Sequence, residues 1–198
     1  MTGIIILAAG SSSRMGQPKQ QLVFQGQTLL QRAMTAAARL TDVKIVVVLG
    51  ANNLSIIPDV DSKRADLVIN PDWEQGMGSS IKAGLKALLE LYPALNNVLL
   101  MLCDQPFVDT ALLHQLIETG LTGDNSIVAC TYQNTIGVPV WFAKTHFDEL
   151  LALQEQKGAK KLLMKYQQEI VTIPFEKGAV DIDSPEDYDG LLGANSPL

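Results

Sequence analysis

A short loop of small residues near the amino terminus carries two basic side chains. Residues 8–19 read AAGSSSRMGQPK. Gly10 and Gly16 permit backbone conformations that other residues avoid, and the small side chains let backbone N–H groups approach a ligand closely. Arg14 and Lys19 add two positive charges to the same loop. A triphosphate requires both exposed N–H groups and cations, so we predict an anion site here.

Two common phosphate-binding motifs do not fit this loop. The dinucleotide fingerprint needs a second glycine where Ser12 stands, and a Walker loop needs Lys and then Ser or Thr where Gln17 and Pro18 stand. Side chains, rather than a helix amino terminus, should therefore neutralise most of the phosphate charge. The alternative is a solvated surface loop, which its place directly after an apolar run disfavours.

Two acidic segments could hold a metal ion. Residues 103–106 read CDQP directly after an apolar run, and a later segment reads VDIDSPEDY. Mg²⁺ prefers oxygen ligands and usually takes one or two carboxylates together with substrate phosphates. Asp104 fits this role, with a cap before a turn as the alternative. Cys103 has no histidine close to it in the sequence, so we interpret it as a small apolar strand residue rather than a nucleophile.

The later acidic segment offers a second carboxylate. Alternation along an extended strand places Asp181 and Asp183 on one side, and Ser184 followed by Pro185 predicts a helix start. We favour Asp183 as the second ligand because it lies closer to that start, and we expect Asp181 to act only as a cap.

A fourth segment also follows an apolar run. Residues 70–80 read NPDWEQGMGSS. Gly76 and Gly78 allow a close backbone approach, and Ser79 or Ser80 is the predicted N-cap of a helix. The free N–H groups of a helix start also suit a polar ligand, so a turn with a cap and a binding role can coexist.

Alternating strands and helices must position these segments. Apolar runs of four to seven residues, most of them rich in β-branched side chains, predict strands; they are Gly3–Ala8, Val43–Leu49, Asp66–Ile69, Val98–Cys103, Ser126–Thr131, Val138–Phe142 and Glu169–Ile173. Helical periodicity between them predicts helices capped by Thr28 and Asp109, and helices over Thr145–Glu155 and Ala159–Tyr166. The alternation predicts an α/β fold, a three-layer, doubly wound and mostly parallel sheet of the Rossmann-like kind. Pro139 predicts an edge or irregular strand.

Composition sets the class of protein. The 198 residues are 47% hydrophobic and 18% charged, which excludes intrinsic disorder, and we expect a single domain over residues 1–198 with a frayed tail at 193–198. The net charge of −6 argues against a nucleic-acid partner, although residues 1–53 carry +4 and residues 54–198 carry −10. The two cysteines lack CxxC spacing and no apolar stretch could span a membrane, so we expect a cytoplasmic protein.

The motifs together resemble a family. The pattern LAAGxSxRMGxxK over residues 7–19 resembles the nucleotidyltransferases similar to the molybdopterin-guanine-dinucleotide synthases, and within them the molybdenum cofactor cytidylyltransferases. The resemblance covers nearly the whole chain. It implies that Arg14 and Lys19 contact a triphosphate, and that Ala9, together with QPKQ at 17–20, indicates CTP. It further implies a nucleotide site that consists of Leu7, Ala8, Ala9, Gly10, Arg14, Lys19, Asn70, Gly76, Ser79, Ser80 and Asp104.

The acceptor side departs from the family pattern. Residues 137–140 and 157–161 resemble the acceptor segments, which implies that Gly137, Pro139 and Lys160 contact the acceptor. However, Val138 replaces the usual His, Gln156 occupies an Asp position, and Lys160 replaces Arg, which differs from Lys in bidentate recognition. A solvated helix face is the alternative for the lysines.

The resulting functional hypothesis is a Mg²⁺-dependent nucleotidyltransferase. Arg14, Lys19 and Asp104 are the predicted catalytic residues, and Asp104 and Asp183 the predicted metal ligands. The resemblance suggests CTP and molybdopterin as substrates, and a recipient molybdoenzyme of the xanthine dehydrogenase type. The alternatives are a sugar or polyol phosphate as acceptor, or a non-catalytic nucleotide-binding accessory protein for a molybdoenzyme. His114 and His146 are interpreted as structural or solvent-facing, and Trp73 and Trp141 as packing residues.

Overall fold

A central sheet organises the chain, of which the computed structural model describes residues 1–154 and 158–193. Its strand order is β5-β4-β1-β6-β8-β7-β9. The strands are β1 (Thr2–Ala8), β4 (Val43–Leu49), β5 (Asp66–Ile69), β6 (Asn97–Leu102), β7 (Ile127–Tyr132), β8 (Thr135–Ala143) and β9 (Val171–Pro174). Each contains most of one predicted apolar run, so the strand predictions are confirmed. A separate two-stranded hairpin is formed by β2 (Val23–Phe24) and β3 (Gln27–Thr28).

The sheet is mostly parallel, as predicted. Strand β1 pairs in parallel with β4 and β6, β4 with β5, and β7 with β9. Strand β8 runs antiparallel to both β6 and β7. The parallel ladders bring the carboxyl ends of β1, β4 and β6 to one edge of the sheet, where the predicted functional loops begin.

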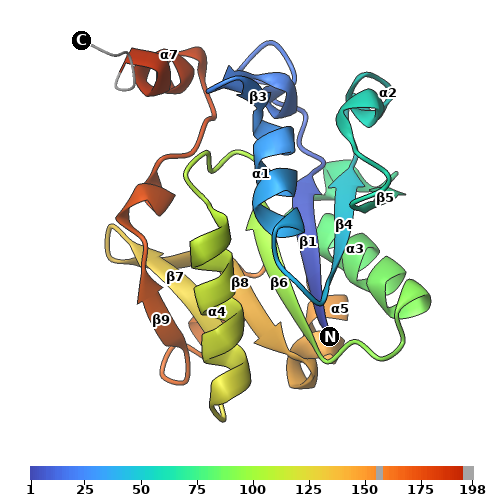
Figure 1. Ribbon diagram of the computed structural model, residues 1–198, viewed down its shortest axis with the longest axis vertical. Helices are drawn as coiled ribbons and strands as arrows, with labels where there is room; N and C mark the ends of the chain where they lie inside the picture. The colour runs from blue at the N-terminus through green and yellow to red at the C-terminus, as the bar shows by residue number, and fades with distance from the viewer. Residues whose placement is uncertain (155–157, 194–198) are drawn as a thin grey trace.

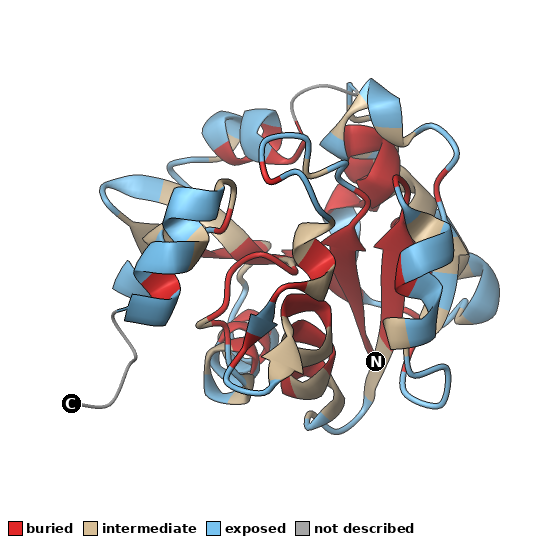
Figure 2. Ribbon diagram, turned by 90° about the horizontal axis from the view of Figure 1, so that it is seen from above, coloured by how far each residue is buried: buried red, intermediate tan, exposed pale blue. Residues whose placement is uncertain are grey.

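Helices cover both faces of the sheet (Figure 1). Helices α1 (Leu29–Ala38) and α4 (Thr110–Thr122) pack on one face, against alternate β1 residues such as Ile4 and Ile6. Helices α3 (Met77–Leu91), α5 (Phe147–Leu151) and α6 (Lys160–Lys165) pack on the other, against Ile5 and Leu7. All of β1 is therefore buried, as Figure 2 shows for the central strands. This continuous burial is typical of parallel strands covered on both faces, and it confirms the three-layer prediction.

Strand β8 is irregular at Pro139, which is one of the two outcomes that this proline predicts. The strand lies inside the sheet between β6 and β7 rather than at an edge. Gly137 pairs with Cys130 and Val140 pairs with Ala129, so Val138 and Pro139 fall between paired positions where the register shifts. The missing N–H of Pro139 therefore leaves no paired position of the strand without a donor.

The carboxyl-terminal segment returns to the amino-terminal loop. Helix α7 (Pro185–Gly193) lies beside the β2–β3 hairpin at the top of Figure 1. Its Tyr188 hydroxyl donates to the Val23 carbonyl at 2.7 Å. A small apolar cluster joins the two ends of the chain and consists of Met15, Leu22, Phe24, Leu29, Ile182 and Leu191. This packing brings the segment before α7 to the predicted phosphate loop.

Short helices complete the described chain. They are η1 (Lys19–Gln21), α2 (Asn53–Ile56), η2 (Ile57–Asp59), η3 (Trp73–Gln75), η4 (Lys144–His146) and η6 (Glu176–Ala179). Across residues 1–154 and 158–193, no helix has the length and apolarity that a bilayer span requires. The predicted frayed tail falls almost wholly on residues 194–198, which lie outside the described residues.

Candidate active site

A cavity of about 300 Å³ lies where β1 and β6 end. The carboxyl ends of the strands, the loop that follows β1 and the start of α3 form its walls. Most of the predicted nucleotide residues line it, namely Leu7, Ala8, Ala9, Gly10, Lys19, Gly76, Ser80 and Asp104. The structure thus brings together residues that are almost 100 positions apart in the sequence, at the place expected for a ligand in an α/β sheet.

The loop after β1 is held from within by Gln20. This side chain is fully buried, and its amide nitrogen donates to the carbonyl oxygens of Ala8 at 2.8 Å and Gly10 at 3.0 Å. The Ser12 hydroxyl accepts a hydrogen bond from the Lys19 backbone N–H at 3.0 Å. No role of Gln20 was predicted from the sequence beyond its part in the family resemblance. Its place in the QPKQ run was the available signal.

Four charged side chains meet beside this cavity. The Lys19 ammonium contacts the Asp104 carboxylate and lies 2.8 Å from Asp183 Oδ1. Arg14 Nη2 lies 2.6 Å from the other oxygen of Asp183. The Arg14 side chain is 72% exposed and that of Lys19 only 15%. The predicted residues from the first and last parts of the chain therefore form one cluster, although Arg14 and Asp183 do not line the cavity itself.

Burial and pairing act in opposite directions on the charges of this cluster. Burial alone would lower the pKa of Lys19, but attraction and hydrogen bonds from Asp104 and Asp183 raise it instead, so the ammonium stays charged at neutral pH. The hydrogen bond from Lys19 lowers the pKa of Asp183. Burial raises the pKa of Asp104 against the opposing attraction of Lys19.

The two aspartates fit a hard divalent cation. Asp104 Oδ1 is buried and has no hydrogen-bond partner among the described residues, so one acceptor is left for another ligand. In the described ranges no three His, Cys, Asp or Glu side chains gather closely enough to hold a metal by themselves. One or two carboxylates completed by substrate phosphates is the arrangement that Mg²⁺ usually takes.

The N-cap of helix α3 differs from the predicted one. Neither Ser79 nor Ser80 is the N-cap, because α3 begins at Met77 after Gly76, whose φ of 110° only glycine adopts easily. Asn70 is buried and its side-chain amide donates to the Ser79 hydroxyl at 2.8 Å and to the Ser80 hydroxyl at 3.0 Å. Asn70 and Ser79 thus lie behind the cavity wall and position Ser80, which lines it.

The segment before α7 also differs from its prediction. Residues 180–184 form no strand, although Ile182 is buried between the flanking aspartates and its N–H donates to the Asp104 carbonyl at 3.2 Å. Asp181 does not cap α7. Ser184 and Asp187 form the cap, with Pro185 at the first helical position as predicted.

The predicted acceptor residues lie away from the 300 Å³ cavity. Gly137 and Pro139 belong to β8, and Pro139 is buried. Lys160 is exposed at the first position of α6. Gln156 and Lys157, which belong to the predicted acceptor segment, lie outside the described residues. The structure therefore does not join this set to the cluster around Lys19.

The remaining tryptophan, cysteine and histidine side chains that the sequence analysis named lie mostly outside the charged cluster. Trp73 packs against Gly50, as expected of a packing residue, but it also lines the cavity. Burial raises the pKa of Cys103 to about 12, which supports its interpretation as an unreactive strand-end residue. His114 is exposed and His146 is buried.

Comparison with known proteins identifies the family. The MobA-like NTP transferase domain matches residues 4–170. The chain belongs to this family. The MobA-like chain is 27% identical to the purine catabolism protein PucB of Bacillus subtilis over 97% of its own length and 96% of PucB.

Solved structures agree with this assignment. A crystal structure of an Rv0371c homolog from Mycobacterium sp. strain JC1 matches with a TM-score of 0.83 and 31% identity, over 98% of this chain and 96% of that one. Rv0371c of Mycobacterium tuberculosis in complex with manganese matches with a TM-score of 0.78 and 29% identity, over 98% of each chain. The protein is a nucleotidyltransferase with the predicted Rossmann-like fold.

Proposed function

We propose that the protein is a Mg²⁺-dependent cytidylyltransferase that joins CTP and molybdopterin to form molybdopterin cytosine dinucleotide and pyrophosphate. The observation that carries this proposal is the cluster of Arg14, Lys19, Asp104 and Asp183 at the edge of a nucleotide-sized cavity. Two cations and two carboxylates are the groups that phosphoryl transfer through a divalent ion requires.

The chain's own residues do little covalent chemistry in this reaction. An oxygen of the acceptor phosphate forms a bond to the α-phosphorus of CTP, and the bond from that phosphorus to the bridging β-oxygen breaks. Lys19 and Arg14 neutralise charge on the triphosphate and on the departing pyrophosphate. Asp104 and Asp183 would hold the metal ion, which supplies further charge neutralisation when bound.

The preference for CTP is supported by the floor of the cavity. Ala8 and Ala9 line it and are almost fully buried, and the Gln20 amide fixes the backbone on both sides of Ala9. We expect the Ala9 methyl to take space that a glycine would leave to a larger base. We therefore expect the smaller cytosine ring to fit better than guanine.

Molybdopterin as acceptor is supported by the family and by the motifs that resemble cytidylyltransferases. The product would serve a molybdoenzyme of the xanthine dehydrogenase type in the cytoplasm, where the two buried free cysteines stay reduced.

A pyrophosphate-release assay tests the proposal. Purified protein is supplied with Mg²⁺, molybdopterin and either CTP, GTP or ATP, and we expect release with CTP well above the other two. Release with GTP alone would refute the CTP preference. Release with CTP only when a sugar or polyol phosphate replaces molybdopterin would move the acceptor to that class.

A further inference from the structure

A second cavity lies on the other side of Leu102. It encloses about 230 Å³, and Leu102 lines both it and the larger cavity. Asp104 lines the larger cavity, whereas Gln105, the next residue, lines the second. Consecutive residues of one loop thus serve two neighbouring cavities, and nothing in the proposed nucleotide site uses the second one.

Gln105, which lines this cavity, has a side-chain oxygen that accepts no hydrogen bond. The residue is 6% exposed, and its amide nitrogen donates to the carbonyl oxygens of Gly178 at 2.9 Å and Val138 at 3.3 Å. Because both contacts are to carbonyls, they fix which end of the amide is the nitrogen. Oε1 is buried and has no hydrogen-bond partner in the described chain, which is costly for a polar atom.

Tyr132 forms a second wall of this cavity. Its ring packs against two glycines: a Cβ at Gly137 would lie 2.3 Å from the Tyr132 hydroxyl oxygen, and a Cβ at Gly178 would lie 2.5 Å from ring atom Cδ1. Gly137, predicted from the sequence as an acceptor residue, therefore shapes this cavity rather than the nucleotide site. The exposed carboxylate of Asp181 completes the lining, and it has no ion-pair partner in the ranges that the structure describes.

We propose that this second cavity binds the ring of the acceptor through adjacent N–H donors. A neutral amide oxygen and a carboxylate accept hydrogen bonds from a ring N–H and an exocyclic amino group, which is the donor edge of an aminopyrimidinone such as a pterin. A ring that enters would displace the wall slightly and supply the donor that Gln105 Oε1 lacks. The inference rests on the proposed function, since the acceptor's phosphate must reach the cluster at Asp104 and Asp183.

The position of Asp181 supports this division of roles. It stands two residues before Asp183, whose carboxylate contacts Lys19 and Arg14. One short segment thus places one carboxylate in the lining of the second cavity and another in the charged cluster beside the larger cavity. An acceptor with its phosphate at one and its ring at the other would span Leu102.

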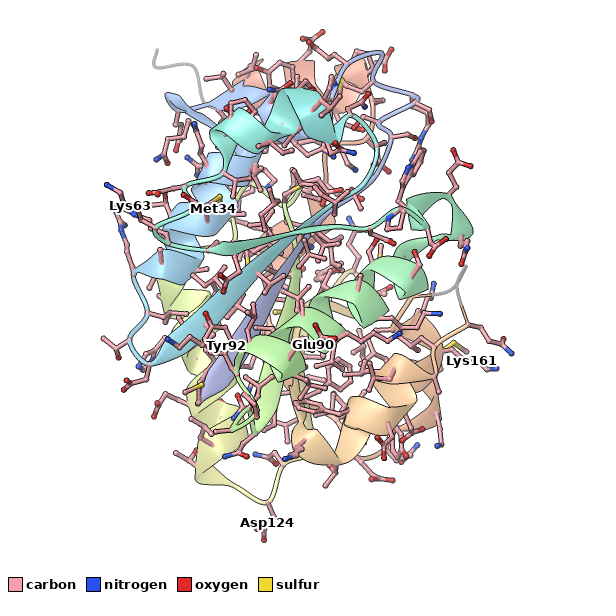
Figure 3. All side chains as sticks on the ribbon, turned by 90° about the vertical axis from the view of Figure 1, so that its right-hand side faces the viewer. Met34, Lys63, Glu90, Tyr92, Asp124 and Lys161 are labelled. Carbon is pink, nitrogen blue, oxygen red and sulfur yellow. The ribbon has the colours of Figure 1, made fainter. Side chains whose placement is uncertain are left out.

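Fluorescence titration with free pterin and with lumazine tests the proposal directly. Lumazine replaces the amino donor at ring carbon 2 with an oxygen, so we expect it to bind about tenfold more weakly than pterin to the protein saturated with CTP and Mg²⁺. Asp181→Asn should weaken pterin binding about tenfold while the dissociation constant of CTP stays unchanged. Asp124→Asn is the matched control, because Asp124 lies at the opposite end of the molecule from α7 (Figures 1 and 3).

The outcomes separate this inference from the proposed function. Equal binding of pterin and lumazine, absence of pterin binding, or an unchanged affinity in Asp181→Asn would overturn the ring site, even if molybdopterin supports pyrophosphate release. Selective pterin binding without pyrophosphate release from molybdopterin would support the ring site and refute the proposed reaction.

Discussion

Asp104 and Asp183 come from distant parts of the chain, and the Lys19 ammonium contacts both of them. Because of this arrangement, a chemical role of Asp104 can be distinguished from a structural one by substitution. If Asp104 is replaced, Lys19 keeps its 2.8 Å contact with Asp183, so the buried ammonium retains a counter-ion. Loss of Asp104 should therefore impair the reaction far more than the fold.

We predict that Asp104→Ala lowers the rate of pyrophosphate release at least about 100-fold, because the negative charge that develops on the phosphates loses the metal ion that Asp104 would help to hold. The circular dichroism spectrum should remain that of the wild type. Asp124→Ala is the control for loss of an aspartate elsewhere. Wild-type turnover of Asp104→Ala at limiting Mg²⁺ would remove Asp104 from the site.

A second prediction at the scale of single residues concerns Gln20. Replacing it with Leu leaves the Ala8 and Gly10 carbonyls without their donor, at a cost of about 1–3 kcal/mol for a buried group. Chemical denaturation should show this loss, and the dissociation constant of CTP should rise because the loop no longer holds its shape. Gln17→Leu, an exposed position in the same loop, should change neither quantity. An equal effect of the two substitutions would contradict the role of Gln20.

At the scale of elements, local signals predicted most strands and the starts of helices α1, α4 and α7. Thr28 caps α1 through a capping box with Gln31, and the Asp109 side chain caps α4, because both helices begin with a side chain that satisfies a free N–H. The start of α3 was wrong because a glycine with positive φ, rather than a serine, precedes its first turn. Sequence spacing does not distinguish a serine that caps from one that a distant Asn70 holds.

The candidate site was predictable to the extent that its residues follow strands. Lys19 is in the loop after β1 and Asp104 follows β6, and the parallel pairing of these neighbouring strands brings both segments to the same end of the sheet. The roles of Gln20 and Gln105 could not be predicted, since they depend on which carbonyl each amide meets after folding. The separate surroundings of Asp181, which lines the second cavity, and of Asp183, which contacts Lys19, also depend on the irregular backbone of 180–184.

The contact between α5 and α6 supports a prediction about acid stability. Glu149 accepts hydrogen bonds from Lys165 Nζ at 2.5 Å and from the Tyr166 hydroxyl at 2.7 Å, and these bonds lower the pKa of Glu149 below its usual 4.5. A carboxyl group with a lowered pKa in the folded state stabilises the fold above its ordinary pKa. That stabilisation is lost as the pH falls through the folded-state pKa.

We therefore expect the melting temperature of the wild type to fall more steeply than that of Glu149→Gln between about pH 5 and about pH 3. Scanning calorimetry across this range measures the two slopes. Asp148→Asn provides the comparison, because Asp148 is exposed on the same helix. Parallel curves for Glu149→Gln and the wild type would show that the contact carries no pH dependence.

At the scale of the whole molecule, the structure explains the uneven distribution of charge along the chain. The net +4 of residues 1–53 includes Arg14 and Lys19, while the acidic remainder supplies Asp104 and Asp183. Packing of α7 on the β2–β3 hairpin brings these opposite charges together beside one cavity. A protein of net charge −6 can thus present both cations for a triphosphate and carboxylates for a metal ion.

The same assembly predicts how a nucleotide should affect global stability. The groups around the larger cavity come from residues 7–20, 73–80 and 102–104, with Asp183 beside them, so a bound nucleotide contacts segments from distant parts of the chain at once. At a concentration of CTP and Mg²⁺ about 100 times the dissociation constant, binding adds about 2.7 kcal/mol to the free energy of unfolding. For a chain of this length we expect one thermal transition that moves up by roughly 5–10 °C as a unit, and that returns most of the way when EDTA removes the metal. Two separate transitions, of which only one responds to CTP, would contradict the predicted single domain over residues 1–198.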